Sequence, residues 1–303
     1  MMKPYKALLA IIPALAFLTF WACVPEQEAL TENYYIRDEG GRPDVIAHGG
    51  SKLLFPENTM MAFDGSVQLG ADILEIDVMM TKDSVLVCHH DETIDRMSNG
   101  SGKLAYTRYE DLLEYNFAYG FEDLNGKYPF KDSNVSITKL EDVFEKYNTM
   151  TYIVEIKDKS GHGKLAGEIL ADMIKDRQLA KQIIVGSFHD KVLVHFYEYS
   201  EGRIPISTSQ KEAVKFTITS KSFMGAVYRP EAVALQLPVK SNGLNLGTKR
   251  VINSAHKHNM AVQYWTINDK DVMEELIEKG ADGIITDRPD LMWELLGEMG
   301  WEK

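Results

Sequence analysis

Cysteine is scarce in this sequence, with only Cys23 and Cys88 among 303 residues. Cys23 ends an apolar N-terminal segment that resembles a lipidation signal, so Cys88 has no expected partner and no disulfide is predicted. Cys88 lies in an apolar run, which indicates a buried thiol. The chain therefore lacks both a disulfide framework and a cluster of thiols.

Basic residues are also in deficit, because 33 Lys and Arg face 45 Asp and Glu, for a formal net charge of −12. Such a balance offers no broad basic surface for phosphate backbones, so no nucleic-acid partner is expected. An anionic small substrate stays possible, since a local site can be positive or hold a metal. The composition, 45% hydrophobic and 26% charged, is that of a globular protein.

A long hydrophobic run is missing as well, although residues 8–24 come close to the ~20 residues that a membrane span needs. Residues 1–22 match an export signal, with Lys3 and Lys6, an apolar middle and small Ala22 before Cys23. A terminal Cys resembles the lipobox of bacterial lipoproteins, although Phe20 and Trp21 are bulky for one. We predict a signal peptide (1–22), lipidation at Cys23, a polar tether (23–44) and an exported lipoprotein anchored to a membrane of the cell envelope. A transmembrane anchor is the alternative.

From residue 45 onward, strand-like and helix-like segments alternate. Helical patterns cover 164–180, 246–259 and 269–280. The strand-like runs are 45–48, 73–78, 85–90, 152–157, 183–188, 204–207, 233–237, 262–267 and 283–286. This alternation predicts an α/β domain over 45–303, and the (β/α)₈ TIM barrel fits its length.

The run 85–90 does not fit a parallel barrel, because only residues 79–84 separate it from the preceding strand. A parallel crossover needs a dozen or more residues. We therefore predict that 85–90 turns back beside 73–78 at the rim, which leaves eight barrel strands. Residues 97–139 have weak periodicity and predict a small rim insertion with one short helix around 108–115.

Carboxylates gather at the predicted strand ends, where barrel active sites lie. Glu75 and Asp77 are two residues apart on one strand and so share a face, where they repel unless a cation lies between them. Glu155 repeats the pattern on the next barrel strand, with Lys157 on the same face. Oxygen ligands favour Ca²⁺ or Mg²⁺ over zinc. Outward-facing salt bridges are the alternative.

Histidines also stand at two strand ends: His48 on one, and His89 or His90 on the other. Two imidazoles beside a metal suit general acid–base chemistry, because imidazole titrates near neutral pH. Strand alternation does not choose between His89 and His90.

These motifs, in order, resemble the glycerophosphodiester phosphodiesterase family: HGG…PENT, GADILEIDVMMTKD, HHDETIDR, EIK, YWTIN and GADGIITDRP, over about residues 45–290. The resemblance implies a (β/α)₈ barrel with a small insertion that hydrolyses glycerophosphodiesters to glycerol 3-phosphate and an alcohol. It assigns the acid–base pair to His48 and His90. Its remaining assignments are metal ligands at Glu75, Asp77 and Glu155, site-ordering residues at Glu57 and Asn58, a phosphate contact at Lys157 and a wall against the glycerol or alcohol at Trp265.

Gly49 departs from the family pattern, which has an arginine that donates to phosphate at this position. Another cation, Lys52 or Arg229, could replace it; the space could admit a different substrate group; or the protein could bind diesters and turn them over poorly. Two alternatives to the main function therefore stay open: a lysophospholipase-D-like activity on lipids, and a non-catalytic diester-binding lipoprotein. An apolar rim would favour the lipid activity, and Phe117, Tyr119, Phe121 and Tyr128 could form it or pack over the barrel.

Overall fold

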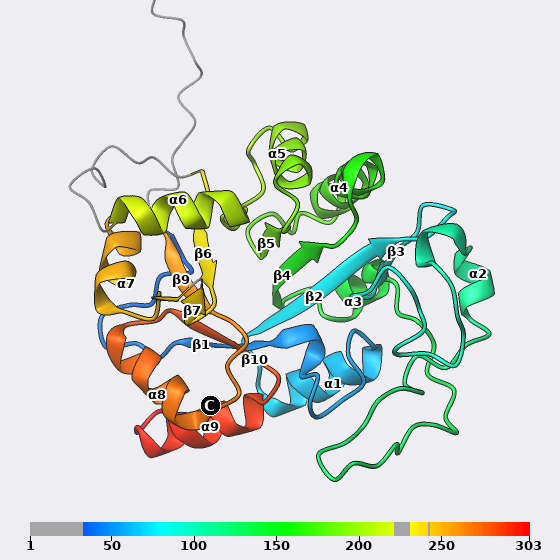
Figure 1. Cartoon of the computed structure of the whole chain (residues 1–303), viewed down its shortest axis with the longest axis horizontal. Helices are drawn as coiled ribbons and strands as arrows, with labels where there is room; N and C mark the ends of the chain where they lie inside the picture. The colour runs from blue at the N-terminus through cyan, green and yellow to red at the C-terminus, as the bar shows by residue number, and fades with distance from the viewer. Residues whose placement is uncertain (1–32, 221–230, 242) are drawn as a thin grey trace, which may run out of the picture. The chain divides into compact units, whose positions relative to one another are not determined.

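The computed structural model describes residues 33–220, 231–241 and 243–303 (Figure 1). The predicted signal peptide, Cys23 and Arg229 lie outside these residues. Among the described helices, none is both long and apolar enough to cross a membrane.

Seven parallel strands form most of a barrel, in the order β5-β4-β2-β1-β10-β9-β6. They are β1 Asp44–Ala47, β2 Ile73–Met80, β4 Thr151–Ile156, β5 Ile183–Gly186, β6 Ala234–Leu237, β9 Ala261–Tyr264 and β10 Gly283–Thr286. All their neighbouring pairs are parallel. The predicted barrel is thus confirmed in its architecture.

The eighth position is held by residues 204–207, which we predicted to be a strand. The segment makes single parallel bridges instead, from Ile206 to Val185 and from Ser207 to Ala234. Pro205 accepts a hydrogen bond from Val185 N at 2.9 Å, but a proline has no N–H to return. The ring is nearly closed by these bridges, without a regular strand at this point.

Strand β3 (Leu86–Cys88) turns back antiparallel to β2, with Val78 opposite Cys88, as the short connection required. The insertion that follows contains η2 (Leu104–Tyr106) and α2 (Tyr109–Leu112), the latter within the predicted 108–115. Of the four aromatic residues considered for an apolar rim, Phe117 and Phe121 are 3% and 4% exposed and pack within the insertion, whereas Tyr128 is 47% exposed and its hydroxyl donates to Glu122.

Helices surround the strands (Figure 1). Their ends shift by a few residues from the predicted 164–180, 246–259 and 269–280, which are observed as α4, α7 and α8. The helices are α1 Met60–Leu69, α3 Leu140–Lys146, α4 Ser160–Asp176, α5 Asp190–Tyr199, α6 Gln210–Ser220, α7 Lys249–His256, α8 Lys270–Lys279 and α9 Pro289–Glu298. A short 3₁₀ helix, η1 (His48–Gly50), follows β1. After β6, β7 (Lys240–Ser241) pairs with β8 (Leu244–Asn245) as a small antiparallel hairpin.

Strand alternation explains how the interior is built. On β2, Leu74 and Ile76 pack with the helices, whereas Ile73 belongs to an apolar cluster that takes one residue from every barrel strand. That cluster includes Ile46, Ile73, Ile153, Ile184, Ala234, Ala261 and Ile285. Because Glu75 and Asp77 follow Ile73 at intervals of two, their side chains also point into the barrel, nearer its C-terminal end.

The segment before β1 lies against the other end of the barrel. Asn33 Nδ2 donates to Val233 O and Asn259 O, at 2.7 and 2.8 Å, just ahead of β6 and β9. Arg37 N donates to Asp282 Oδ1 at 3.0 Å, and Tyr35 is 7% exposed. A polar tether was predicted to reach residue 44, but from Asn33 the backbone and an aromatic side chain are already bound to the barrel.

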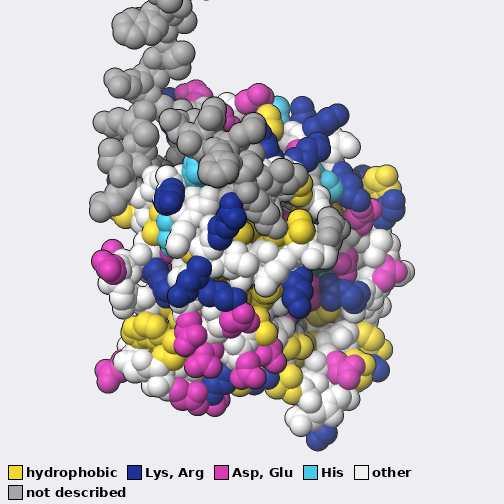
Figure 2. All heavy atoms as spheres, turned by 60° about the vertical axis from the view of Figure 1, so that its left-hand side comes forward, with side chains coloured by type: hydrophobic (Ala, Val, Ile, Leu, Met, Phe, Trp, Pro, Cys, Tyr) yellow, Lys and Arg dark blue, Asp and Glu magenta, His cyan; other side chains and the backbone are white. Residues whose placement is uncertain are grey.

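Charged side chains of both signs lie on the surface. Figure 2 shows one face, on which a group of Asp and Glu side chains in the lower part lies below several Lys and Arg side chains, while further Asp and Glu side chains lie at its edges.

Candidate active site

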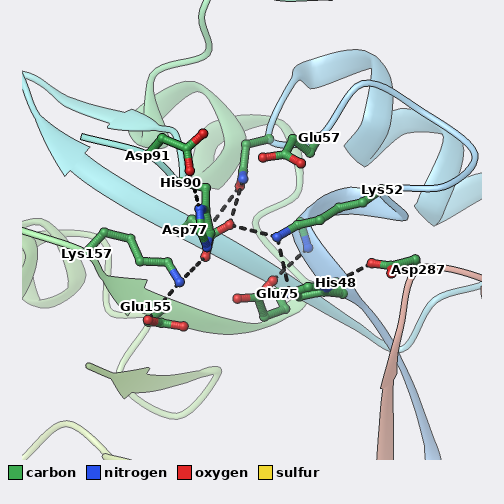
Figure 3. Close-up of polar contacts among 12 residues, drawn as sticks. His48, Lys52, Glu57, Glu75, Asp77, His90, Asp91, Glu155, Lys157 and Asp287 are labelled. Atoms are coloured by element: carbon green, nitrogen blue, oxygen red, sulfur yellow. Dashed lines mark hydrogen bonds and ion pairs between the residues drawn. The ribbon is translucent and has the colours of Figure 1, made fainter. Parts of the chain in front are cut away.

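Three carboxylates meet at the C-terminal end of the barrel (Figure 3). Glu75 and Asp77 come from β2, and Glu155 comes from the neighbouring β4, where it stands opposite Asp77 in the register. One oxygen from each lies within 4.8 Å of the others. That spacing suits a cation with bonds of about 2.0–2.6 Å to oxygen.

Burial makes this cluster unfavourable unless positive charge is present. Glu75 and Asp77 are 4% and 0% exposed. Burial and the charge of Asp77 raise the pKa of Glu75. Burial also raises the pKa of Glu155 to about 7, although Lys157 opposes the shift. A bound divalent cation would hold all three ionised, so the donor set fits a hard, oxygen-preferring metal.

Two lysines supply part of that positive charge. Lys157 Nζ lies 3.0 Å from Asp77 Oδ1 and 2.8 Å from Glu155 Oε1. Neither oxygen accepts a hydrogen bond of normal geometry, although both are buried. Lys52 Nζ lies 3.3 Å from Asp77 Oδ2. Burial favours a higher pKa for Asp77, but the two ammonium groups outweigh it and hold the pKa well below its usual range.

The PENT loop holds Asp77 in place. Asn58 Nδ2 donates to Asp77 Oδ2 at 2.8 Å, and Asn58 Oδ1 accepts from Asp77 N at 3.1 Å. Asn58 adopts a left-handed φ of 56°, which asparagine tolerates better than most residues. Thr59 follows as the N-cap of α1, where its hydroxyl accepts from Ala62 N at 3.2 Å and donates to Pro56 O at 2.7 Å. The loop and the helix start therefore position this carboxylate together.

His48 is held by an aspartate from the last barrel strand. Its Nδ1 lies 2.7 Å from Asp287 Oδ1, and Asn268 Nδ2 donates to Asp287 Oδ2 at 2.7 Å. With the proton on Nδ1, the imidazole Nε2 faces Lys52 Nζ at 3.2 Å. Burial favours a lower pKa for His48, but the hydrogen bond to Asp287 and the charge of Glu75 outweigh it and raise the pKa.

His90 has a similar support on its own side. Its Nδ1 lies 2.7 Å from Asp91 Oδ1, and Arg96 Nε donates to Asp91 Oδ2 at 2.6 Å. Arg96 also pairs with Glu57, with Nη2 at 2.5 Å from Oε1. Glu57 is therefore connected to His90 through Arg96 and Asp91. His89 points away, buried against Phe117 with its Nε2 3.0 Å from a backbone carbonyl, which leaves His90 as the histidine of this pair that lines the cavity.

Lys52 occupies the space next to Gly49. A Cβ on Gly49 would lie 2.2 Å from Lys52 Cε and 3.1 Å from its Cγ. Gly49 also has a left-handed φ of 50°, and its N–H donates to Glu75 Oε2 at 2.7 Å. The volume that a longer side chain would fill at position 49 is thus taken by the lysine three residues later.

A single cavity of about 690 Å³ joins these groups. His48, Glu75, His90, Glu155 and Lys157 line one side, and every one of them lies on or just after a strand. Trp265 lines the other side, with its ring centroid 5.7 Å from that of Phe188. Thr208 Oγ1 is buried in the wall and has no hydrogen-bond partner among the described residues. Of the residues singled out from the sequence, Lys52, Glu57, Asn58 and Asp77 do not themselves line the cavity, but they contact its lining residues or the residues that support them.

Sequence reasoning left four supporting residues without a role: Asp91, Arg96, Asn268 and Asp287. All four lie within the motifs HHDETIDR, YWTIN and TDRP. Asp91 follows His90 directly, and that adjacency was a usable signal. The pairing of His48 with Asp287 joins the first and last barrel strands, and no local pattern contains it.

Comparisons with known proteins agree on one family. The sequence profile of the "Glycerophosphoryl diester phosphodiesterase family" matches residues 48–291. A glycerophosphodiester phosphodiesterase of Caldanaerobacter subterraneus is 32% identical over 261 residues, which cover 84% of this chain and 98% of that protein. One from Bacillus altitudinis is 27% identical over the same shares of the two chains.

Solved structures show the same fold. An Oleispira antarctica phosphodiesterase, solved in complex with the product sn-glycerol-3-phosphate, superposes with a TM-score of 0.67 at 20% identity, over 84% of this chain and 97% of that one. A glycerophosphoryl diester phosphodiesterase domain from Mycobacterium tuberculosis gives a TM-score of 0.73 at 16% identity, over 84% and 99%.

Proposed function

The chain belongs to the glycerophosphoryl diester phosphodiesterase family and is a phosphoric diester hydrolase, and we propose that it is a metal-dependent enzyme that hydrolyses glycerophosphodiesters to glycerol 3-phosphate and an alcohol by paired-histidine catalysis. One observation carries the proposal: two histidines, each with an aspartate on Nδ1, line the same cavity as two of three clustered carboxylates. Such an arrangement places proton donors and acceptors beside a site for an anion.

Glu75, Asp77 and Glu155 would hold the divalent cation, either Ca²⁺ or Mg²⁺. When bound, the cation withdraws charge from the phosphodiester and stabilises the additional negative charge of the transition state. The charges also balance: three carboxylates and two lysines leave one excess negative charge, a divalent cation reverses it, and a phosphodiester neutralises the remainder.

His48 and His90 would move the protons. Their aspartates fix the ring orientation, so that each Nε2 is the atom free to exchange a proton. One imidazole accepts the proton of the attacking oxygen while the other gives a proton to the departing alcohol oxygen. The bond from phosphorus to the alcohol breaks, and the hydroxyl of water ends on phosphate. Thr208 Oγ1 offers a free hydroxyl to the glycerol, and Trp265 would pack against the organic group.

Lys52 would take over the role of the family arginine. Its side chain fills the space at Gly49, and its ammonium lies beside His48 Nε2. A cation held by Asp77 would free Lys52 and Lys157 from neutralising that carboxylate, so both could donate to the phosphate oxygens. This arrangement leaves the binding-only alternative without its one sequence argument, the missing arginine.

The test is release of glycerol 3-phosphate from glycerophosphocholine and glycerophosphoethanolamine by the full-length protein in detergent, with EDTA, Ca²⁺ or Mg²⁺. We expect metal-dependent release that His48→Ala and His90→Ala each lower by at least about 10²-fold. The control is His195→Ala, because His195 pairs with Glu168 on the surface, away from the cavity. Undiminished activity in both active-site variants would refute the paired-histidine assignment.

Metal binding has its own readout. Calorimetric titration with Ca²⁺ and Mg²⁺ should show binding to the wild type and none to Glu75→Gln. Asp111→Asn, an exposed carboxylate on α2, is the matched control. Retained tight binding in Glu75→Gln would overturn the ligand assignment.

We also propose that residues 1–22 are a signal peptide and that lipidated Cys23 holds the protein on a membrane of the cell envelope. The sequence pattern supports this. Labelled palmitate should be incorporated by the wild type and not by Cys23→Ser, which should be recovered without the membranes. Equal labelling of the two would contradict it.

A further inference from the structure

We propose that the side of the cavity remote from the carboxylates is a subsite for a hydrocarbon chain, so that the substrates include phosphodiesters carrying one aliphatic chain. The inference rests on the proposed function, because the chain is attached to the diester that the catalytic groups hold. It deepens that function by naming a class of substrate.

The residues of this side are uncharged, several of them are apolar, and they come from elements outside the catalytic motifs. Helix α6 contributes Ala213 and Val214 together with the uncharged polar Gln210 and Thr217, and the β7–β8 hairpin contributes Leu244 and Ser241. Val214, Leu244 and Phe188 are 51%, 45% and 47% exposed. Exposed apolar side chains that gather at one cavity mouth mark a binding surface for an apolar group.

This surface is continuous with the phosphate end of the site. Lys157 Nζ lies 5.7 Å from the centroid of the Phe188 ring, and that ring is packed edge-on against Trp265. A chain bound along Phe188 would therefore begin within reach of a phosphate held by Lys157. The two ends of the cavity can be filled by one molecule.

The charges of the lining residues decide between a hydrocarbon chain and a charged head group. Apart from His48, Glu75, His90, Glu155 and Lys157, the described residues that line the cavity carry no charge. An aromatic pair can bind a quaternary ammonium group. Here, however, the Phe188 ring already faces the ammonium of Lys157, which would repel a second cation. A neutral chain meets no such repulsion.

The cavity is also larger than a small diester needs. About 690 Å³ lies within the range of pockets that hold drug-sized ligands, roughly 300–1,000 Å³. A phosphodiester with a choline or ethanolamine group would leave the part bounded by α6 and the hairpin to water. An aliphatic chain would displace that water from apolar side chains.

Two substrate series test this with the full-length protein and the metal that supports activity. In the first, glycerol 3-phosphate is esterified to n-alkanols from ethanol to octanol, and hydrolysis yields glycerol 3-phosphate and the alkanol. In the second, the chain is an ether on the glycerol of glycerophosphocholine, and hydrolysis releases choline. We expect KM to fall with chain length in at least one series, by up to about fourfold per buried methylene. The series that responds shows which side of the phosphate carries the chain.

Charged substitutions in the subsite should remove this dependence. Val214→Asp and Leu244→Asp place a carboxylate in the path of the chain, so the ratio of octyl to ethyl kcat/KM should fall at least tenfold. Both residues are about half exposed, so the folded state should tolerate the change. The matched control is Val194→Asp, a 54% exposed valine on α5 that does not line the cavity. Its ratio should match the wild type.

Binding without turnover separates this inference from the proposed function. Octyl phosphate should bind the wild type at least tenfold more tightly than ethyl phosphate, and Val214→Asp should lose the difference. Hydrolysis of glycerophosphoethanol with a flat chain-length profile and equal binding of the two phosphates would overturn the subsite alone. Preferential binding of octyl phosphate, with no hydrolysis of any diester, would uphold the subsite and refute the proposed function.

Discussion

His48 depends on a neighbour that its own strand does not supply. Asp287 directly follows β10, the last strand of the barrel, and its Oδ1 lies 2.7 Å from His48 Nδ1, and Asn268 Nδ2 donates to Asp287 in turn. The tautomer of His48 is therefore set by contacts across the closing seam of the barrel. We predict that through these contacts Asp287 positions His48 for the proposed proton transfer.

Replacing Asp287 by Asn should lower kcat by about 10²–10⁴-fold, because an amide can donate to Nδ1 and favour the wrong tautomer. Metal binding should stay at the wild-type level, since Asp287 is not one of the three clustered carboxylates. Steady-state kinetics and calorimetric titration measure the two effects. Glu168→Gln, which changes the partner of surface His195, is the control and should leave both unchanged. A parallel loss of metal affinity would show that Asp287 acts on the carboxylate cluster instead.

If Lys52 acts in place of the family arginine at position 49, substitutions at positions 49 and 52 should compensate for one another. Lys52→Met should lower kcat/KM by about 10- to 100-fold through loss of a charge-assisted hydrogen bond. Gly49→Arg alone should also impair the enzyme, because its Cβ would meet Lys52 Cε. The double variant Gly49→Arg/Lys52→Ala should recover a large part of the loss, less the cost of a non-glycine residue at a φ of 50°.

Inhibition by inorganic phosphate, measured on the same variants, separates phosphate binding from folding. It should weaken in Lys52→Met and return in the double variant. A double variant that is no better than Gly49→Arg would mean that Lys52 does not act in place of the arginine.

At the scale of elements, the first turn of α1 is part of the site. Thr59 caps the helix, and the residue before it holds Asp77 through two hydrogen bonds. The cap therefore links the start of a helix to a carboxylate on β2. Another threonine, Thr248, caps α7 in the same manner, with its hydroxyl accepting from Val251 N at 3.3 Å.

These two caps allow a matched comparison. Thr59→Ala and Thr248→Ala should each lower the free energy of unfolding by about 1 kcal/mol, the usual loss for a capping side chain. Only Thr59→Ala should also weaken metal binding, because only that loop positions a proposed metal ligand, Asp77. Urea unfolding and calorimetric titration give the two values. Equal metal affinities in the two variants would show that Asn58 is held without the cap.

The elements also show what could be predicted from the sequence. The period-two spacing of Glu75 and Asp77 placed both inside the barrel, and the short link after Met80 required an antiparallel β3. Residues 204–207 looked like a strand, yet Pro205 interrupts the ladder there. The His48–Asp287 contact depends on which strands meet when the barrel closes, so local periodicity could not give it. The apolar side of the cavity was also missed, because Val214 and Leu244 look like ordinary residues of a helix and a hairpin.

At the scale of the whole molecule, Asp44, Asp72 and Asp282 lie near one another at the N-terminal end of the barrel. Asp44 begins β1, and burial together with the charge of Asp72 raises its pKa to about 7, although Arg42 opposes the shift. Between the unfolded pKa near 4 and this value, the folded protein holds a proton that the unfolded chain has lost. Stability should therefore fall as the pH rises through that interval.

Asp44→Asn removes the titrating group, so its stability relative to the wild type should increase from about pH 5 to about pH 8. We expect a gain of about 1–2 kcal/mol, less than the full pKa shift implies because the side chain is only part-buried. Urea unfolding at the two pH values measures it, with exposed Asp111→Asn as the control. A gain that is the same at both pH values would show that Asp44 does not titrate in this range.

Asn33 is tied to the barrel at the starts of β6 and β9, whereas the cavity opens where the strands finish. A membrane attachment upstream of Asn33 would therefore join the barrel at the N-terminal end of its strands, opposite to the mouth of the cavity. A fully stretched spacer of residues 23–32 would reach at most ~35 Å. If Cys23 is lipidated as proposed, the anchor joins the barrel at the end opposite to the cavity, so the mouth itself stays open to amphiphiles dissolved in the surrounding fluid.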